Sequence, residues 1–599
     1  MLKKFFTVFL GSMAAIWLSF LVFGVIVVIS VFSWIGNSNV PSIKSNSILL
    51  IDLNGEITDR QPTFNPREII MGGLSDAPSF NEIIEAVRLA KTDSDIKGIY
   101  LRLQDGAAAL AMRQELRDLL MEFKQSGKWI IAYAESCGQG DYYTGTIADE
   151  FYLNPTGSLA ANGMASSVPF FKNALDKLGV EIQVIKVGTF KSAVEPFILT
   201  QMSDSARMQY DVMLNTMWDS YVSGVINDRK LPSDSCTMFK AMAATPMMAF
   251  TAEELVDAKL FDGLKYGYEV ENILKSKAGS DKDLRLVTPR EYLAVYSDNN
   301  LIKKLGEKDH IAVLYAVGDI VESGSEGIVG QEMAPLIVRM ADNDNIKGLV
   351  LRINSGGGSA YASEQIWASL EYFKSKNKPF VVSMGDVAAS GGYYIACGAD
   401  EIFADPATIT GSIGIFGIIP YGQKLLNDKL GINFSVVETN PNAAFPRLDA
   451  PLTPAQHAAL EKSIHNGYDL FVHRVATGRK MEDGAVRRIA EGRVWAGETA
   501  LQIGLVDKMG GLTDAIAKVA ERTGLSTDNY VEYPALKSSP LDMLMSMQLI
   551  KAELPWQPAK DILNNLGLDA QDIREGRQIV RRLCDMGTIQ AKMEDITIR

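Results

Sequence analysis

Two side chains in different halves of the 599-residue chain could together perform nucleophilic catalysis. Ser390 lies in the small-residue stretch MGDVAASGGYY (384–394), and Lys191 lies in VGTFKSAVEPF (187–197). A serine hydroxyl is a weak nucleophile until a nearby base takes its proton. A lysine amine can be that base if desolvation lowers its pKa from about 10.4 toward about 7. The neighbours of Lys191 that could exclude water are Phe190, Ala193, Val194 and Phe197.

One acidic residue close to Lys191 in the sequence, Glu195, would oppose this role. A carboxylate beside the amine would hold the proton on the lysine. We therefore expect the Glu195 side chain to point elsewhere, toward a backbone amide or an arginine.

The chain repeats itself at an offset of about 250 residues. IKGIYLRL (96–103) returns as IKGLVLRI (346–353), and TAEELVDAKLFDGL (251–264) matches AGETALQIGLVDKM (496–509). The clearest pair is GDYYTGTIADEFYLNP (140–155) with GGYYIACGADEIFADP (391–406), which share seven identities in sixteen positions. Unrelated segments share about one, so the sequence indicates two homologous domains of about 240 residues each.

The two repeats have lost opposite parts of the candidate chemistry. Ser390 aligns with Gln139, so the N-terminal half lacks the hydroxyl. Lys191 aligns with Ala443, so the C-terminal half lacks the amine. A single composite site per chain, built between the halves or between subunits, accounts for both losses.

Four stretches together resemble one known family. These are NSGGGSAYASE (354–364), MGDVAASGGYYIA (384–396), TGSIGIFG (410–417) and VGTFKSAVEPF (187–197). They are similar to the signature stretches of the long, duplicated form of signal peptide peptidase A. The resemblance extends from about residue 45 to about residue 530 and includes an N-terminal anchor. It departs from the family at Gly356, which replaces the proline of NSPGGS and would loosen the loop without removing its amides.

The resemblance implies a role for each candidate residue. Ser390 would be the nucleophile, Lys191 the general base, and Ser412 a hydrogen-bond partner that orients the lysine amine. The family hydrolyses peptides, works without a cofactor, and assembles into a ring that is usually a tetramer in the long form. Its fold is the crotonase/ClpP-like fold.

The developing oxyanion needs backbone donors, and glycines suit this because absent side chains let the backbone approach the carbonyl closely. Gly357 or Gly358 would supply one amide, and Gly391, directly after the serine, would supply the other. Losing one such donor costs about 3 to 4 kcal/mol. We also expect a helix from Gly391 to Ala396, whose N-terminal dipole would favour the same negative charge. The N-terminal repeat has lost the glycine run, since Gly357 and Gly358 align with Ala107 and Ala108.

The elements that must position these residues are those of an α/β fold. Short apolar, β-branched runs predict strands at Gly348–Ile353, Phe380–Ser383 and Glu401–Phe403, with a helix at Tyr361–Ser375. Parallel strands joined by crossover helices follow. We expect four parts: an anchor at 1–36, repeats at 45–295 and 308–530, and a helical extension at 531–599 that packs against a neighbouring part.

The N-terminus predicts one membrane span. After Lys3 and Lys4, an uncharged, mostly apolar run covers Phe5–Ile35, which is ample for a hydrocarbon core of about 30 Å. It is about twice the apolar length of a cleaved signal peptide, so we expect an uncleaved anchor. The positive-inside rule places the two lysines in the cytoplasm and the repeats on the outer side. For a bacterium, this is a single-pass protein of the inner membrane with periplasmic catalytic domains.

Composition excludes some partners. A net charge of −13 argues against nucleic acid, which needs clustered basic residues. The four cysteines contain no CxxC pair and the four histidines no HExxH spacing, so we expect no metal. His457, His465 and His473 recur every eight residues, about 80° apart on a helix, and we interpret them as helix surface or packing residues.

The expected function is that of a membrane-anchored serine endopeptidase of the cell envelope that degrades hydrophobic peptides such as cleaved signal peptides. The substrate class comes from the resemblance. Two alternatives stay open. A crotonase-type acyl-CoA enzyme would need neither the anchor nor the serine–lysine pair, and a catalytically silent scaffold or adaptor would act by binding alone.

Overall fold

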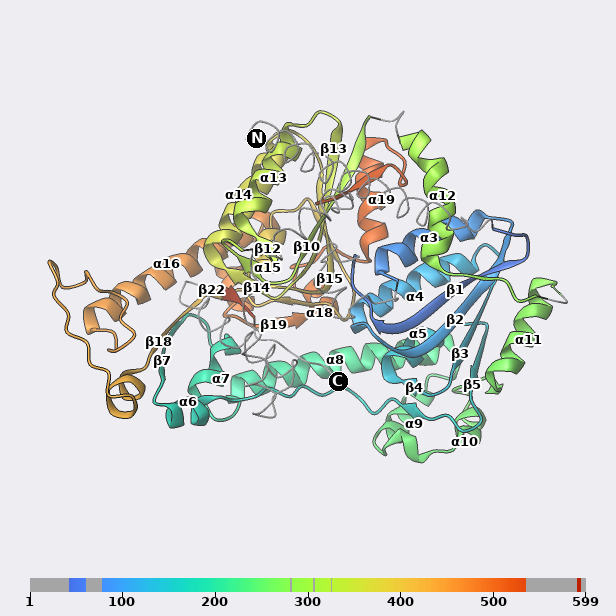
Figure 1. Ribbon diagram of the computed structural model, residues 1–599, viewed down its shortest axis with the longest axis horizontal. Coiled ribbons are helices and arrows are strands. Elements are labelled where there is room, and N and C mark those ends of the chain that lie inside the picture. Colours follow the sequence, from blue (N-terminus) through green and yellow to red (C-terminus); the bar gives the residue numbers. More distant parts are fainter. Residues whose placement is uncertain are drawn as a thin grey trace, which may run out of the picture.

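The structure is a computed structural model that describes residues 43–60, 78–280, 283–304, 308–324, 326–534 and 590–593 (Figure 1). The predicted anchor and most of the predicted C-terminal extension lie outside these residues. Within the described ranges, no helix is both long and apolar enough to cross a membrane.

The N-terminal repeat is built on six strands in the order β8-β5-β3-β2-β1-β9, with every pair parallel. Alternate residues of Ile48–Ile51 enter two hydrophobic clusters, one on each face of the sheet. Such strands read as continuous apolar runs because both faces are covered. The strands are β1 (Ser47–Glu56), β2 (Ile96–Ala107), β3 (Trp129–Ala134), β5 (Glu150–Leu153), β8 (Gly263–Leu264) and β9 (Leu286–Val287); β4 (Cys137–Gly138) and β6 (Leu159–Ala160) form a separate pair.

The helices of this repeat begin with polar caps where the chain turns away from the sheet. Ser203 caps the longest of them by accepting a hydrogen bond from the Ala206 amide. The helices are α3 (Phe80–Thr92), α4 (Leu110–Lys124), α5 (Gln139–Gly145), α6 (Lys172–Leu178), α7 (Glu195–Ile198), α8 (Asp204–Asp228), α9 (Ser235–Ala243), α10 (Ala252–Asp257), α11 (Gly267–Ala278) and α12 (Pro289–Lys304).

The C-terminal repeat has the same plan. Its sheet has the order β19-β17-β15-β13-β10-β21, with β16 and β20 branching from β15, and all pairs are parallel except β17 with β19. The strands are β10 (His310–Val317), β13 (Ile346–Ser355), β15 (Phe380–Ala389), β16 (Glu401–Ala404), β17 (Ile409–Gly411), β19 (Val494–Ala496), β20 (Lys508–Met509) and β21 (Tyr530–Tyr533). The helices are α13 (Gly330–Asp342), α14 (Ala360–Ser375), α15 (Gly391–Ala396), α16 (Pro454–Arg479), α17 (Asp483–Ile489), α18 (Gly497–Gln502) and α19 (Leu512–Thr523).

The predicted strands and helices around the serine are confirmed, as is the parallel α/β architecture. The duplication is visible in the elements, since β2, α4, α5 and α8 of the first repeat recur as β13, α14, α15 and α16 of the second. In Figure 1, α8 runs below both sheets, and its contacts reach from α5 and α9 to β19 of the other repeat.

A third sheet joins the repeats, in the order β12-β11-β14-β22-β18-β7. Its end strand β7 (Glu181–Lys186) belongs to the first repeat and pairs antiparallel with β18 (Phe416–Tyr421) of the second. The segment that carries Lys191 therefore crosses into the C-terminal half. The other strands are β11 (Ile320–Val321), β12 (Ile328–Val329), β14 (Gly357–Ser359) and β22 (Gln590–Lys592).

The described residues of the predicted helical extension are not helical. Residues 530–533 form β21 at the edge of the second sheet, and residues 590–592 form β22 inside the third sheet. Open backbone edges at β10, β14 and β18 supply the hydrogen-bond partners, and this tertiary pairing overrides the local pattern.

Charged residues seal the interface between the repeats. The buried Arg352 guanidinium lies 2.9 Å from a carboxylate oxygen of Asp59 and 2.9 Å from one of Glu115, both from the first repeat. Asn354 donates to Asp59 over 3.0 Å, and Asp386 accepts from the Met112 amide over 3.0 Å. The hydrophobic core is also continuous across this interface, because Ile311 and Val313 of β10 pack into the cluster of the first repeat.

Candidate active site

Ser390 stands on the sharp turn between β15 and α15. Its φ of 55° and ψ of −115° lie outside the ordinary regions for a residue with a side chain, and such strain is held only by surrounding structure. Here the Ser390 amide donates to the Gly411 carbonyl over 2.8 Å, and its carbonyl accepts from the Tyr394 amide over 2.8 Å. The predicted helix Gly391–Ala396 is confirmed and begins directly after the serine.

Lys191 follows β7 and meets Ser390 within a single chain. Its Nζ lies 2.7 Å from Ser390 Oγ, although the two residues are 199 positions apart. The same Nζ donates to Ser412 Oγ over 2.9 Å and to the Ser412 carbonyl over 3.0 Å. The structure thus brings together the three side chains named from the sequence.

The environment of the amine is dry. Lys191, Ser390 and Ser412 are all 0% exposed, and the ring of Phe416 has its centroid 6.0 Å from Lys191 Nζ. Burial of this kind disfavours the charged form of an amine. The Glu195 carboxylate accepts from the amide of Ser203 over 3.0 Å and from its hydroxyl over 2.6 Å. The expectation that Glu195 engages a backbone amide is confirmed.

A loop that the sequence did not single out, residues 490–493, holds the Lys191 backbone. The Phe190 amide donates to the Glu491 carbonyl over 2.9 Å, and the Gly492 amide donates to the Ile413 carbonyl over 2.8 Å. A Cβ at Gly492 would lie 2.6 Å from Lys191 Cβ, and its φ of +76° also favours glycine. The only local signal was one glycine in a polar loop, which is too common to mark a site.

The glycines predicted for the oxyanion hole divide into two kinds. The Gly357 amide donates to Ser355 Oγ over 3.1 Å and is already used. Gly358 lies opposite Ala591 of β22 in the third sheet, and Gly391 begins α15. Of the two alternatives in the loop, Gly358 is therefore the better candidate donor, with Gly391 as the second.

The equivalent place in the first repeat holds no such pair. Gln139, which aligns with Ser390, accepts from the Gly163 amide over 3.0 Å through its Oε1. Ala161, which aligns with Ser412, is fully buried and has no polar side chain. An amide side chain thus fills the space, and within the described ranges the dyad geometry occurs once.

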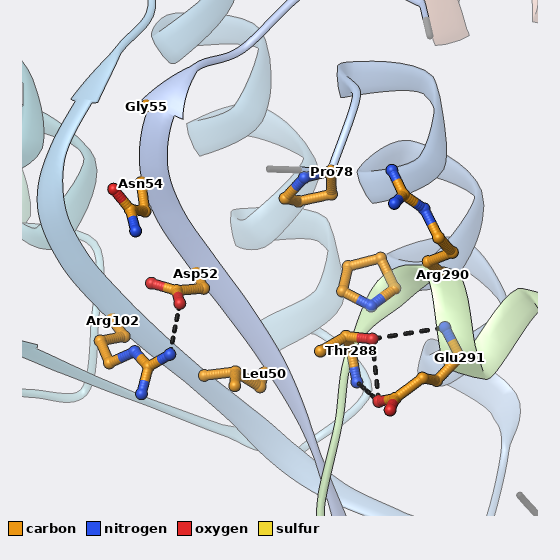
Figure 2. Close-up of a pocket in the computed structure, with 10 residues that line it drawn as sticks. Leu50, Asp52, Asn54, Gly55, Pro78, Arg102, Thr288, Arg290 and Glu291 are labelled. Atoms are coloured by element: carbon orange, nitrogen blue, oxygen red, sulfur yellow. Dashed lines mark hydrogen bonds and ion pairs between the residues drawn. The ribbon is translucent and has the colours of Figure 1, made fainter. Parts of the chain in front are cut away.

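The remaining titratable candidates lie away from this site. His457, His465 and His473 are exposed on α16, which confirms that they are helix surface residues. A cavity of about 530 Å³ lies in the first repeat between β1, β2 and the start of α12 (Figure 2). Its polar side chains pair with one another, as in Asp52 with Arg102 and Glu291 with Thr288. It contains none of the predicted site residues.

Comparison with known proteins gives two family matches. The model of peptidase family S49 matches residues 122–281 and 372–526, one segment in each repeat, and that of Clp protease matches residues 309–408. Together the two S49 segments cover more than half of the chain.

Named relatives cover most of the chain. It is 37% identical to "Protease 4" of Salmonella typhi over 90% of this chain and 88% of that protein. It is 28% identical to "Serine protease SPPA, chloroplastic" of Arabidopsis thaliana over 92% of this chain and 78% of that one. It is also 30% identical to "Putative signal peptide peptidase SppA" of Enterococcus faecium, over 37% of this chain and 66% of that one. A solved structure of a ClpP1 mutant from Listeria monocytogenes matches 36% of this chain and 98% of its own, with 15% identity and a TM-score of 0.24.

Proposed function

The chain belongs to peptidase family S49 and is a serine protease, and we propose that it works by a Ser390–Lys191 dyad on hydrophobic peptides at a membrane surface. The observation that carries the proposal is the 2.7 Å contact between Lys191 Nζ and Ser390 Oγ in a fully buried niche. Neither an acyl-CoA enzyme nor a silent scaffold is favoured by any comparable observation.

The proposed mechanism assigns one step to each group. Uncharged Lys191 takes the proton of Ser390 Oγ as this oxygen attacks the substrate carbonyl carbon. Ser412 orients the amine through its hydroxyl and its carbonyl. The amides of Gly358 and Gly391 stabilise the oxyanion, after which Lys191 returns the proton to the leaving amine. Water then hydrolyses the acyl-enzyme by the same base.

Labelling with a fluorophosphonate probe tests the nucleophile. We expect the wild type to be labelled and Ser390→Ala to be unlabelled, because the phosphorus traps only an activated hydroxyl. Ser363→Ala is a matched control, since Ser363 is a buried serine near Gly391 whose hydroxyl donates to the Ser359 carbonyl. Equal labelling of wild type and Ser390→Ala, or labelling of neither, would refute the proposal.

Membrane anchoring is the second part of the proposal and rests on the sequence of residues 5–35. We propose a single-pass protein of the bacterial inner membrane with its repeats on the periplasmic side, where hydrophobic remnants of secreted precursors emerge. The full chain should stay in the membrane fraction after alkaline carbonate extraction, whereas a chain that begins at residue 37 should not. Release of the full chain by carbonate would contradict the anchor.

Assembly into a homo-oligomer, in the family a tetramer, is the third part. Residues 433–438 align with β7 at an offset of 252, yet within the described ranges they pair with no strand. Their apolar side chains are exposed: Phe434 by 52%, Val436 by 40% and Val437 by 97%. Because β7 itself pairs with β18, the unpaired stretch supports an equivalent pairing with another copy of the chain.

Light scattering after size exclusion tests this interface. We expect Val437→Lys to shift the protein toward the monomer, because a charge would be buried in the pairing. Met248→Lys, at a residue that is 66% exposed in the first repeat, should leave the oligomer unchanged. An unchanged mass for Val437→Lys would place the interface elsewhere.

A further inference from the structure

The chain's own C-terminal segment lies in the cleft beside the dyad. Strand β22 runs antiparallel between β14, which carries the oxyanion glycines, and β18, which follows Ser412 (Figure 1). Its register pairs Ala591 with Gly358 and Gln590 with Ser359. The Met593 amide also donates to the Gly356 carbonyl over 2.7 Å. Main-chain pairing of an extended segment with an open sheet edge is a common way to bind a peptide.

One carbonyl of this segment lies against the predicted oxyanion hole. A Cβ built on Gly357 would be 2.2 Å from the Ala591 carbonyl oxygen, and one built on Gly391 would be 2.9 Å from the same oxygen. Two glycines from different elements therefore face a single carbonyl oxygen. Only residues without side chains allow this approach. With β22 in place, Ser390 is fully buried.

The side chains of the segment are also accommodated. Ala591 is 0% exposed, so the space beside Gly358 holds a small apolar side chain. Met593 is 4% exposed and joins a hydrophobic cluster with Met217, Ile409 and Val494. On the opposite face, Lys592 Nζ lies 2.7 Å from a carboxylate oxygen of Asp319. Each side chain from Ala591 to Met593 thus has a separate partner in the cleft.

We propose that residues 590–593 are an internal substrate, and that the enzyme cuts its own chain between Ala591 and Lys592. This proposal rests on the proposed dyad. Ser390 Oγ attacks the Ala591 carbonyl carbon while Lys191 takes the serine proton. The bond between Ala591 and Lys592 breaks, and the proton passes to the Lys592 nitrogen, which releases Lys592–Arg599. Water then hydrolyses the Ser390 ester and leaves a chain that ends at Ala591.

The arrangement has two consequences for the enzyme. An external peptide must occupy the same gap between β14 and β18, so the uncut chain competes with its substrates. The cleaved bond should also follow a small residue, because the side-chain site that Ala591 occupies is closed to solvent.

C-terminal peptide mapping by mass spectrometry of the purified full chain tests the proposal. We expect wild type to end at Ala591 and Ser390→Ala to retain Lys592–Arg599. Ala591→Ser should be cut as wild type is, whereas Ala591→Phe should stay whole because a ring does not fit the small site. Hydrolysis of an added fluorogenic peptide by the wild type is measured in parallel.

The outcomes separate this proposal from the proposed function. A wild type that keeps its C-terminus while hydrolysing the added peptide overturns self-cleavage and leaves the dyad assignment intact. Ser390-dependent cutting at a different bond overturns the assignment of Ala591. Loss of both activities in the wild type overturns self-cleavage together with the proposed function.

Discussion

Lys191→Met lowers kcat/KM for a peptide substrate by about a thousandfold or more, in the range of about 10²–10⁴ expected when a general base is removed. The methionine side chain has a similar length and suits the buried niche, so the fold should persist while the only amine bonded to Ser390 Oγ in the described structure is lost. An internally quenched fluorogenic peptide measures the rate, and circular dichroism checks the fold.

Lys186→Met is the matched control for this change. Lys186 lies on the same crossing strand, and its Nζ donates to the Lys191 carbonyl over 3.2 Å without reaching Ser390. It should stay within about tenfold of wild type. Ser412→Ala should fall between the two, because loss of one hydrogen bond worth about 1.5–3 kcal/mol slows the reaction by about ten- to a hundredfold. Near wild-type hydrolysis by Lys191→Met would remove the base assignment.

Arg352→Met destabilises the protein by about 3–5 kcal/mol, the cost of breaking a buried ion pair. Arg352 is fully buried and is the cation that contacts the Asp59 and Glu115 carboxylates at the interface between the repeats. Its removal leaves these two carboxylates in a dry interior without their cation. Urea unfolding followed by tryptophan fluorescence measures the loss.

The duplication supplies the control for this prediction. Arg102 occupies the equivalent position in the first repeat, where it pairs with Asp52 and is 36% exposed. Because exposed pairs contribute about 0–1 kcal/mol, Arg102→Met should cost about 1 kcal/mol or less. Equal destabilisation by the two substitutions would show that Arg352 does not hold the repeats together.

The effect of Arg352→Met should also depend on pH. Burial raises the pKa values of Glu115, Asp386 and Asp405 above their ordinary range, even with Arg352 present. The folded state therefore binds more protons than the unfolded state, so this contribution to stability is present at low pH and is lost as pH rises above the ordinary carboxyl range. Removing the cation raises these pKa values further. The destabilisation should therefore be larger at pH 8 than at pH 5.

The sequence predicted the site because duplication exposes divergence. Gln139 in place of serine and Ala443 in place of lysine marked both halves as incomplete, and this pointed to one shared site without any structure. The strands around Ser390 were equally accessible, because parallel strands buried on both faces produce short, continuous apolar runs.

Other parts of the site have no local signal. The crossing of β7 to β18 depends on pairing between segments more than 200 residues apart. Gly357 and Gly358 are indistinguishable in sequence, and only the hydrogen bond to Ser355 separates their roles. The strand at residues 590–592 was predicted as helix, because what decides its conformation is the open edge of β14 and not its own composition.

The crossing of β7 also has a consequence for the newly synthesised protein. Lys191 leaves the ribosome first, Ser390 follows 199 residues later, and the loop that fixes the lysine backbone comes about 300 residues after it. At about 5–20 residues per second, translation of that interval takes about 15 to 60 s. A nascent chain is thus unable to digest its neighbours at the translocation channel, and proteolytic competence arises only when synthesis of the second repeat is nearly complete.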